Sequence, residues 1–358
     1  MKKTLIALIG LTCGISQAQF NPDAPWVNQG NKAKSGKTME FQEVSQAFDS
    51  YWKNKDHTKK GSGYKPFMRW REYWKHALLP DGTVPTPQFF WNAWEQRKKM
   101  TATTKNASAA TWTPMGPFDH NQTGSWAPGQ GRVNVAIVDP NNPSTFYVGA
   151  PGGGIWKSTD RGANWTPLSD KLPQIGVSGI AIDPNNSKVI YISTGDDDTN
   201  DNYSIGVLKS TDGGASWNKT GLTFTSSRAS SNDIYIDPNN SNTLWVATDT
   251  GVYKTTNAGT NWTKTLNGNI KDIKLKPGNS KVIYAATSSN FYKSTDGGNT
   301  FSQKQSGLPS RSGRLVIDIT PANPEYVYVL SAKTGFTFQG LYKSTNSGES
   351  FTLSLIHI

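Results

Sequence analysis

Four aspartates, Asp196, Asp197, Asp198 and Asp201, crowd into one short polar stretch of the chain. Carboxylate oxygens are the ligands that calcium prefers, and carboxylates this close in sequence could share one ion, although the spacing is not that of an EF-hand loop. Two of them could instead act as general acid and base, because glycoside hydrolysis needs a pair of carboxyl groups. A solvated acidic loop is the third interpretation. We expect no cofactor, with calcium at this loop as the alternative.

Other site chemistries find little support in the sequence. His57, His76, His120 and His357 show no metal-ligand spacing. Nucleophile elbows, Walker loops and dinucleotide fingerprints are absent. The single cysteine, Cys13, falls within the first 18 residues, so we expect neither a disulfide framework nor a thiolate metal site beyond them.

One eight-residue stretch occurs five times and must position whatever site the chain has. Its pattern is Ser/Thr-x-Asp/Asn-x-Gly-x-x-Trp/Phe, and successive copies are 52, 45, 39 and 50 residues apart. A repeat of this length is typical of solenoids and propellers. The copies begin at Ser158, Ser210, Thr255, Ser294 and Ser344.

Each copy lies within a unit of four short strands. The first unit reads Arg132–Pro140, Thr145–Ala150, Gly154–Ser158 and Asn164–Leu168. A proline closes the first strand because it cannot continue a ladder. Four-stranded meanders repeated radially are propeller blades. We therefore predict an all-β fold, a β-propeller of four-stranded antiparallel blades, with five blades visible within residues 111–352.

The repeated stretch fits a structural hairpin turn between the third and fourth strands. Its Asp or Asn can accept backbone hydrogen bonds, its glycines permit positive φ, and its aromatic residue can wedge between blades. A phosphate cradle is disfavoured because the loop leads into a strand and not a helix, and five copies of one catalytic acid would be odd. The predicted structural residues are Asp160, Trp165, Asp212, Trp217, Asn257, Trp262, Asp296, Phe301, Asn346 and Phe351.

These repeats resemble the Asp-box propellers, also called bacterial neuraminidase repeats. Three sequence segments are most similar to the sortilin-type and xyloglucanase-like branch of secreted bacterial proteins. They are Gly131-Arg-Val, Tyr147-Val-Gly and Gly154-Ile-Trp-Lys-Ser-Thr-Asp. The aromatic leader is similar to that of large bacterial surface proteins ending in a C-terminal sorting domain. The resemblance covers residues 112–352 and implies a fold shared by sialidases, glucanases, sorting receptors and assembly factors.

The resemblance bears on the site in two ways. In xyloglucanase-like enzymes a catalytic Asp precedes a Gly-Gly-aromatic stretch of the first blade, and here Pro151 takes its place. A sialidase needs an Arg-Ile-Pro start and three arginines, and Arg-Ile-Pro is absent. Ligands of propellers commonly lie where loops opposite the repeated turn surround the channel. Candidates for that face are Trp126, Arg132, Tyr203, Arg228, Arg311, Arg314, Phe336 and Phe338.

The residues before the repeats differ in character. Met1–Ala18 has the three parts of a secretory signal. Residues 19–110 hold 15 Lys/Arg against 8 Asp/Glu, which is most of the formal charge of +11. Apolar residues at helical spacing predict helices over Thr38–Lys55, Pro66–Leu79 and Gln88–Lys99, with a linker up to residue 110. We interpret their aromatic faces as docked on a neighbouring domain, with a glycan or nucleic-acid platform as the alternative.

Both ends of the repeat region suggest an incomplete ring. Trp112-Thr-Pro-Met115 matches the fourth strand of a blade, as in Trp165-Thr-Pro-Leu168, yet the fifth unit already has its own fourth strand at Phe351. At least one further blade is therefore expected. Residues 353–358 resemble a translated sequencing adapter, which predicts a non-native tail, with a native strand as the alternative.

The leading hypothesis is a non-catalytic propeller of a secreted or cell-surface bacterial protein that binds protein or polysaccharide. The alternative is a glycoside hydrolase of xyloglucanase or sialidase type, with Asp196, Asp197, Asp198 and Asp201 as candidate acids. A second alternative is an assembly or sorting factor. We expect neither a nucleic-acid partner nor a membrane span.

Overall fold

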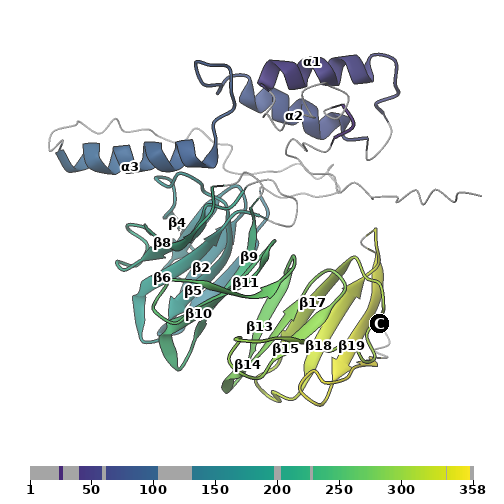
Figure 1. The fold of residues 1–358 in the computed structure, drawn as a ribbon. Coiled ribbons are helices and arrows are strands. Elements are labelled where there is room, and N and C mark those ends of the chain that lie inside the picture. Colours follow the sequence, from purple (N-terminus) through teal and green to yellow (C-terminus); the bar gives the residue numbers. More distant parts are fainter. Residues whose placement is uncertain are drawn as a thin grey trace, which may run out of the picture. The chain divides into compact units, whose positions relative to one another are not determined.

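The computed structural model describes residues 24–26, 40–58, 62–103, 131–196, 203–225, 229–335 and 337–354. These residues form α1–α3 and β1–β20 (Figure 1). The strands make five four-stranded antiparallel sheets, and in each sheet the strands follow chain order. The predicted all-β class with four-stranded blades is confirmed. The chain divides into two compact units, residues 1–85 and 86–358.

Each sheet, numbered here in chain order, is a simple meander. Sheet 1 holds β1 (Val135–Asp139), β2 (Asn142–Ala150), β3 (Gly154–Ser158) and β4 (Thr166–Pro167). Sheet 2 holds β5 (Val177–Asp183), β6 (Asn186–Thr194), β7 (Gly206–Ser210) and β8 (Asn218–Thr223). Sheet 3 holds β9 (Ser231–Asp237), β10 (Asn240–Thr248), β11 (Gly251–Thr255) and β12 (Thr263–Asn267). Sheet 4 holds β13 (Asp272–Lys276), β14 (Asn279–Ala286), β15 (Phe291–Ser294) and β16 (Ser302–Gln303). Sheet 5 holds β17 (Arg314–Ile319), β18 (Val327–Ala332), β19 (Phe338–Ser344) and β20 (Thr352–Leu353).

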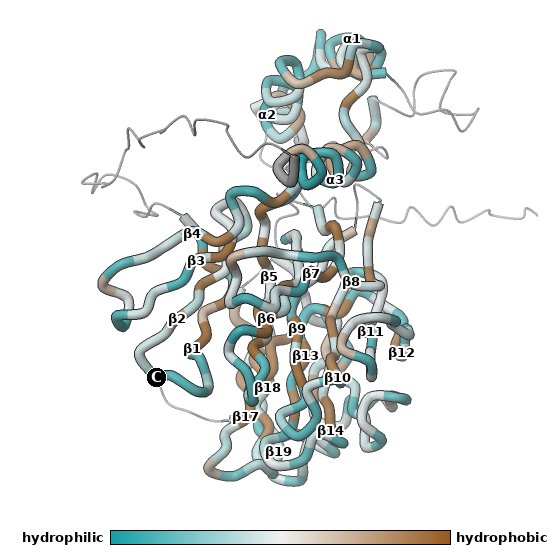
Figure 2. Tube along the Cα trace, turned by 90° about the vertical axis from the view of Figure 1, so that its left-hand side faces the viewer, coloured by the Kyte–Doolittle hydropathy of each residue, from teal (hydrophilic) through white to brown (hydrophobic). Residues whose placement is uncertain are grey.

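Successive sheets pack face to face, and their first strands β1, β5, β9, β13 and β17 are neighbours in that order. Separate apolar clusters fill the successive junctions, such as the one that joins Tyr284 and Phe291 of sheet 4 to Ile317 and Val329 of sheet 5. The hydropathy colouring in Figure 2 shows apolar stretches along the strands and hydrophilic turns between them. Because a sheet between two others buries both faces, β5 is buried throughout and the last six residues of β10 are buried.

The repeated turn is held by one hydroxyl and one carboxyl or amide group. In sheet 2 the Ser210 hydroxyl donates to Asp212 Oδ1 at 2.7 Å and accepts the Gly214 N–H at 2.8 Å. Asp212 Oδ1 also accepts the Ser216 N–H at 2.9 Å. The other four turns repeat these three bonds, including those with Asn257 and Asn346. Burial opposes the charge of Asp212, but hydrogen bonds from Ser216 and Ser210 hold its pKa at about 2.

The fifth residue of the turn must be glycine because the turn lies against the preceding sheet. Gly298 has φ of 75°, and a Cβ there would lie 2.6 Å from the indole nitrogen of Trp245 in sheet 3. The aromatic residue that ends the turn can also contact the preceding sheet. Trp217 is buried and donates its indole N–H to the Leu168 carbonyl of sheet 1 at 3.0 Å. Trp165, in the first sheet, is 38% exposed.

Helix α3 (Pro87–Thr103) belongs to the same compact unit as the sheets. Trp91 and Trp94 are buried in the apolar cluster of sheets 1 and 2. Lys98 Nζ lies 3.2 Å from Asn218 Oδ1, at the start of β8. The aromatic face of this helix therefore docks on the sheets, as its spacing predicted.

Helices α1 (Phe41–Trp52) and α2 (Tyr64–Trp74) pack in the other unit. Their core is aromatic, with the rings of Phe48 and Phe67 stacked at 4.1 Å. Among the described helices, none is long and apolar enough to cross a membrane. The proposed signal, the linker after α3 and the Trp112 strand lie outside the described residues. Leu353 ends β20, and residues 355–358 also lie outside.

Replacing Asp212 by Ala should lower the free energy of unfolding by about 1 kcal/mol, because the turn loses acceptors for Ser210 and Ser216. Asp212→Asn should cost less than half as much, since Asn fills this position in two natural turns. Urea unfolding of the two variants measures both values. Equal losses for Ala and Asn would contradict the role given to the side-chain oxygen.

Candidate functional site

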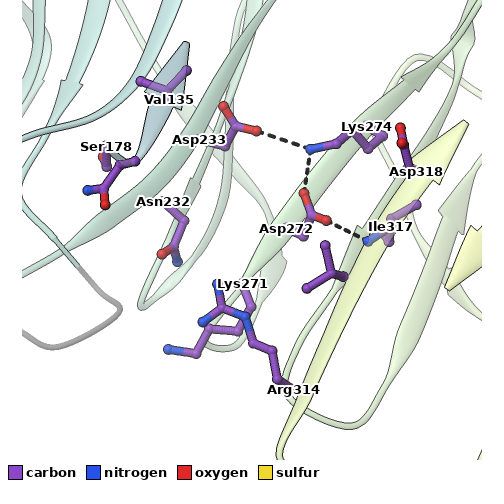
Figure 3. A pocket seen from close by; sticks show the side chains of 12 residues that line it. Val135, Ser178, Asn232, Asp233, Lys271, Asp272, Lys274, Arg314, Ile317 and Asp318 are labelled. Atoms are coloured by element: carbon purple, nitrogen blue, oxygen red, sulfur yellow. Dashed lines mark hydrogen bonds and ion pairs between the residues drawn. The ribbon is translucent and has the colours of Figure 1, made fainter. Parts of the chain in front are cut away.

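The first strands of the sheets border one cavity of about 420 Å³. We call it the inner pocket. Asn134 precedes β1, and Ser178, Asp233, Asp272 and Arg314 come from β5, β9, β13 and β17. Figure 3 shows the side chains of Ser178, Asp233, Asp272 and Arg314 gathered from strands far apart in the sequence. A cavity of this size falls within the range of small-ligand sites.

A lysine between two aspartates forms the polar centre of the inner pocket. Lys274 Nζ lies 2.6 Å from Asp272 Oδ1 and 3.3 Å from Asp233 Oδ2 (Figure 3). The second oxygen of Asp272 accepts the Ile317 N–H at 2.6 Å, whereas Asp233 Oδ1 accepts the Ile234 N–H at 2.9 Å. The Lys274–Asp233 contact connects sheets 3 and 4, and the bond from the Ile317 backbone N–H to Asp272 connects sheets 4 and 5.

Burial sets the protonation of this centre. Loss of water raises the pKa of Asp233 to about 6, even though the Lys274 ammonium acts in the opposite direction. Burial alone would lower the pKa of Lys274, but Asp233 and Asp272 outweigh it and raise the pKa above its usual range. The pocket therefore combines a permanent ammonium with a carboxyl group that can hold a proton near neutral pH.

Asp196, a candidate metal ligand or catalytic acid, lies buried against other side chains of the chain. Its side chain is 1% exposed and forms an ion pair with Arg132. Asn134 Nδ2 lies 3.4 Å from the other carboxyl oxygen of Asp196. Asn134 borders the inner pocket, so the Arg132–Asp196 pair holds part of the pocket wall through its contact with Asn134. A carboxylate engaged in this way is poorly placed to receive a substrate or a solvated ion.

The other candidate site residues do not gather in one place. Arg314 lines the inner pocket, whereas Arg311 is exposed, and its carbonyl accepts the Gln339 amide at 3.0 Å. Tyr203 is half-buried in the core of sheets 1 and 2, and Phe338 is 63% exposed. The remaining candidates Trp126, Asp197, Asp198, Asp201, Arg228 and Phe336 lie outside the described residues. Within the described ranges, no group of three or more His, Cys, Asp or Glu side chains could hold a metal.

Sequence reasoning missed Asp233, Asp272 and Lys274. They lie in strands, and Lys274 meets Asp233 across 41 residues of sequence. The register nevertheless held a signal. The position of Lys274, opposite the aromatic residue of the second strand, is occupied by Ile137 in sheet 1 and Ala181 in sheet 2. Sheet 3 carries Tyr235 there, whereas sheet 5 carries Asp318, and the two charged residues at this position, Lys274 and Asp318, both line the inner pocket.

The raised pKa of Asp233 predicts a pH-dependent contribution to stability. The folded pKa of about 6 exceeds the unfolded value of about 4, so the contribution is full below pH 4 and is lost as the pH rises through 6. Relative to Asp233→Asn, which does not titrate, the natural chain should lose on the order of 2 kcal/mol between about pH 4 and about pH 8. Urea unfolding of both proteins at each pH measures the difference. A constant difference would show that Asp233 titrates normally.

The comparisons with known proteins agree with this architecture. The Sortilin-Vps10 family model, described as sortilin, neurotensin receptor 3, matches residues 153–268. A xyloglucanase of Paenibacillus sp is 25% identical over 181 residues, which are 42% of this chain and 17% of that protein. A xyloglucanase of Acetivibrio thermocellus is 29% identical over 150 residues, 38% of this chain and 18% of that protein. The chain thus spans less than a fifth of these curated relatives.

Among solved structures, an ancestral GH74 enzyme superposes with a TM-score of 0.53 at 21% identity, over 63% of this chain and 31% of that one. At this identity the superposition shows the fold alone. With the family model and the curated relatives, it confirms that the chain resembles the sortilin-type and xyloglucanase-like β-propellers.

Proposed function

We propose that this propeller is part of an exported glycoside hydrolase that acts on a β-glucan of the xyloglucan kind. The observation that carries the proposal is the alignment of the sheets with xyloglucanases from separate organisms. This choice departs from the binding role that the sequence alone favoured. Export rests on the three-part pattern of Met1–Ala18.

The inner pocket supports this proposal with one suitable acid. A glycosidase needs a carboxyl group that is protonated near its working pH and can give that proton to the leaving oxygen. The carboxyl of Asp233 has a pKa raised to about 6 by burial, and its side chain stays 22% exposed. Asp272 is a weaker candidate because its side chain is only 9% exposed and its contacts with Lys274 and the Ile317 N–H are both 2.6 Å, whereas Lys274 lies 3.3 Å from Asp233. Asp272 and Lys274 therefore position Asp233.

A second candidate function is binding of polysaccharide or protein without cleavage. Pro151 favours it, because the resemblance to xyloglucanase-like enzymes places a catalytic Asp there. Pro151 is buried in the turn between β2 and β3 and has no carboxyl group to offer. If the protein binds without cleaving, the role of Asp233, Asp272 and Lys274 is to hold the sheets together.

The test is hydrolysis of xyloglucan by the whole chain, measured as new reducing ends. Asp233→Asn should reduce the rate about 100-fold or more, the usual loss for a general acid. The matched control is Asp237→Asn on the same strand, which lies outside the inner pocket and should keep full activity. Far-UV circular dichroism checks that each variant is folded.

Affinity electrophoresis in xyloglucan gels separates the two functions. Release of reducing ends that depends on Asp233 supports the hydrolase. Retardation in the gel without release would overturn the hydrolase and support binding. Neither retardation nor release would overturn both glycan proposals.

A further inference from the structure

A second hollow, of about 370 Å³, lies where the repeated turn of sheet 3 meets that of sheet 4. We call it the outer groove. Sheet 3 provides most of its lining, from β11, the repeated turn and β12, and sheet 4 provides Asn299. Sheets 3 and 4 lie between sheets 2 and 5, so the outer groove involves neither end of the array. It shares no lining residue with the inner pocket.

The outer groove is lined by a lysine and has no aspartate or glutamate among its described lining residues. Lys254 is half-buried there, and its Nζ lies 2.8 Å from Asn299 Oδ1. In the junction of sheets 4 and 5 the equivalent lysine, Lys293, forms an ion pair at 2.7 Å with Glu349, which holds the same position of its turn as Asn299. The partner of Lys254 is therefore a neutral amide where that of Lys293 is a carboxylate.

Burial leaves the charge of Lys254 only partly compensated. Loss of water lowers the pKa of this lysine, and the more distant charges of Asp296 and Asp237 act in the opposite direction without restoring it. Neither aspartate lines the outer groove. An anion bound in the groove would supply the missing negative charge.

The repeated turn of sheet 3 also lacks a hydrogen bond that the other four turns make. In those turns the side chain of the seventh residue bonds to that of the third. The pairs are Asn164–Asp160, Ser216–Asp212, Thr300–Asp296 and Ser350–Asn346.

In sheet 3 the same two positions hold Asn261 and Asn257, and both line the outer groove. Asn257 Oδ1 accepts the Asn261 N–H and the Thr255 hydroxyl, each at 2.9 Å. Within the described part of the chain, the amide nitrogen of Asn257 and the side chain of Asn261 have no hydrogen-bond partner. Two amide groups are thus available to a ligand.

Two hydroxyl groups complete the polar lining. Thr265 Oγ1 is buried and has no partner among the described residues. Thr263 is exposed and lies directly opposite Lys254 in the pairing of β11 with β12. Amides and hydroxyls suit the hydroxyl groups of a sugar, which both donate and accept, whereas an ammonium suits a carboxylate.

We propose that the outer groove binds a polysaccharide whose sugar units carry carboxylate groups, such as a chain of uronates. Lys254 pairs with the carboxylate of one unit, and the amides of Asn257 and Asn261 bond to hydroxyl groups of the same chain. This binding site goes beyond the proposed hydrolase and does not depend on it, because the two sites have no residue in common.

The test is binding of trigalacturonate to the whole chain, measured by isothermal titration calorimetry. An ionic strength of about 0.15 M screens general attraction to a basic chain. Trigalacturonate should bind at one site. Its full methyl ester keeps the sugar rings without the charges, so it should bind at least tenfold more weakly.

Asn257→Asp is the sharpest variant. It places in the outer groove the carboxylate that sheets 1, 2 and 4 carry at this position, so repulsion should weaken binding at least tenfold. Folding should be retained, because three natural turns hold an aspartate there. The matched control is Asn346→Asp, the same change in the turn of sheet 5, which should bind like the natural chain because Asn346 lies outside the groove.

A second pair of variants removes a positive charge. Lys254→Gln should weaken binding at least tenfold, since the carboxylate loses its partner. Lys281→Gln removes an exposed lysine of β14 outside the outer groove and should leave binding unchanged. Circular dichroism checks that all four variants are folded.

The proposal fails if trigalacturonate does not bind, or if its methyl ester binds equally well. Equal losses in the groove variants and their controls would reveal only general attraction to a basic chain. Unchanged binding by Asn257→Asp would place the site elsewhere, and either result would overturn the proposal. Hydrolysis of xyloglucan does not enter the readout, so the hydrolase and the outer groove can each fail alone.

Discussion

Everything in the propeller unit depends on a small hydrogen-bonded turn whose donors and acceptors lie within seven residues. A hydroxyl such as that of Ser210 and an oxygen such as that of Asp212 satisfy backbone N–H groups that no strand can pair. The turn then brings a glycine and an aromatic residue against the preceding sheet, where Trp217 reaches Leu168. A local bond pattern therefore fixes a long-range contact, and its repetition builds the array.

Because the contacts between successive sheets stabilise the fold, the residues on the first strand of each sheet are free to vary. Sheet 1 fills two of them with Val135 and Ile137, whereas sheet 4 places Asp272 and Lys274 there. The resulting charges do not disturb the ladders, since each side chain is compensated by a neighbour on the next first strand. Different residues of the same strands thus form the scaffold and the site. Similarity of fold therefore says little about the chemistry of this site.

The sequence predicted the strands, the turns and the helical spacing of α1–α3 because each is encoded within a few residues. It did not predict the inner pocket, because Asp233 and Lys274 meet only once sheets 3 and 4 are stacked. From its acidic neighbours it also offered Asp196 as a calcium ligand, as a catalytic acid or as part of a solvated loop, and the structure buries this side chain against Arg132. Charge density along a chain does not tell whether a carboxylate faces solvent or an arginine 64 residues away.

The mixture of Asp and Asn in the five turns has a consequence for behaviour in acid. Hydrogen bonds from Asn164 and Ser158 lower the pKa of Asp160 to about 2, so that turn keeps its carboxylate until the solution becomes strongly acidic. The contribution is present above about pH 4 and fades as the pH falls through about 2. Asn257 and Asn346 have no charge to lose. Strong acid should therefore remove a charge from the bond pattern of the turns in sheets 1, 2 and 4, and leave the same bonds of Asn257 and Asn346 unchanged.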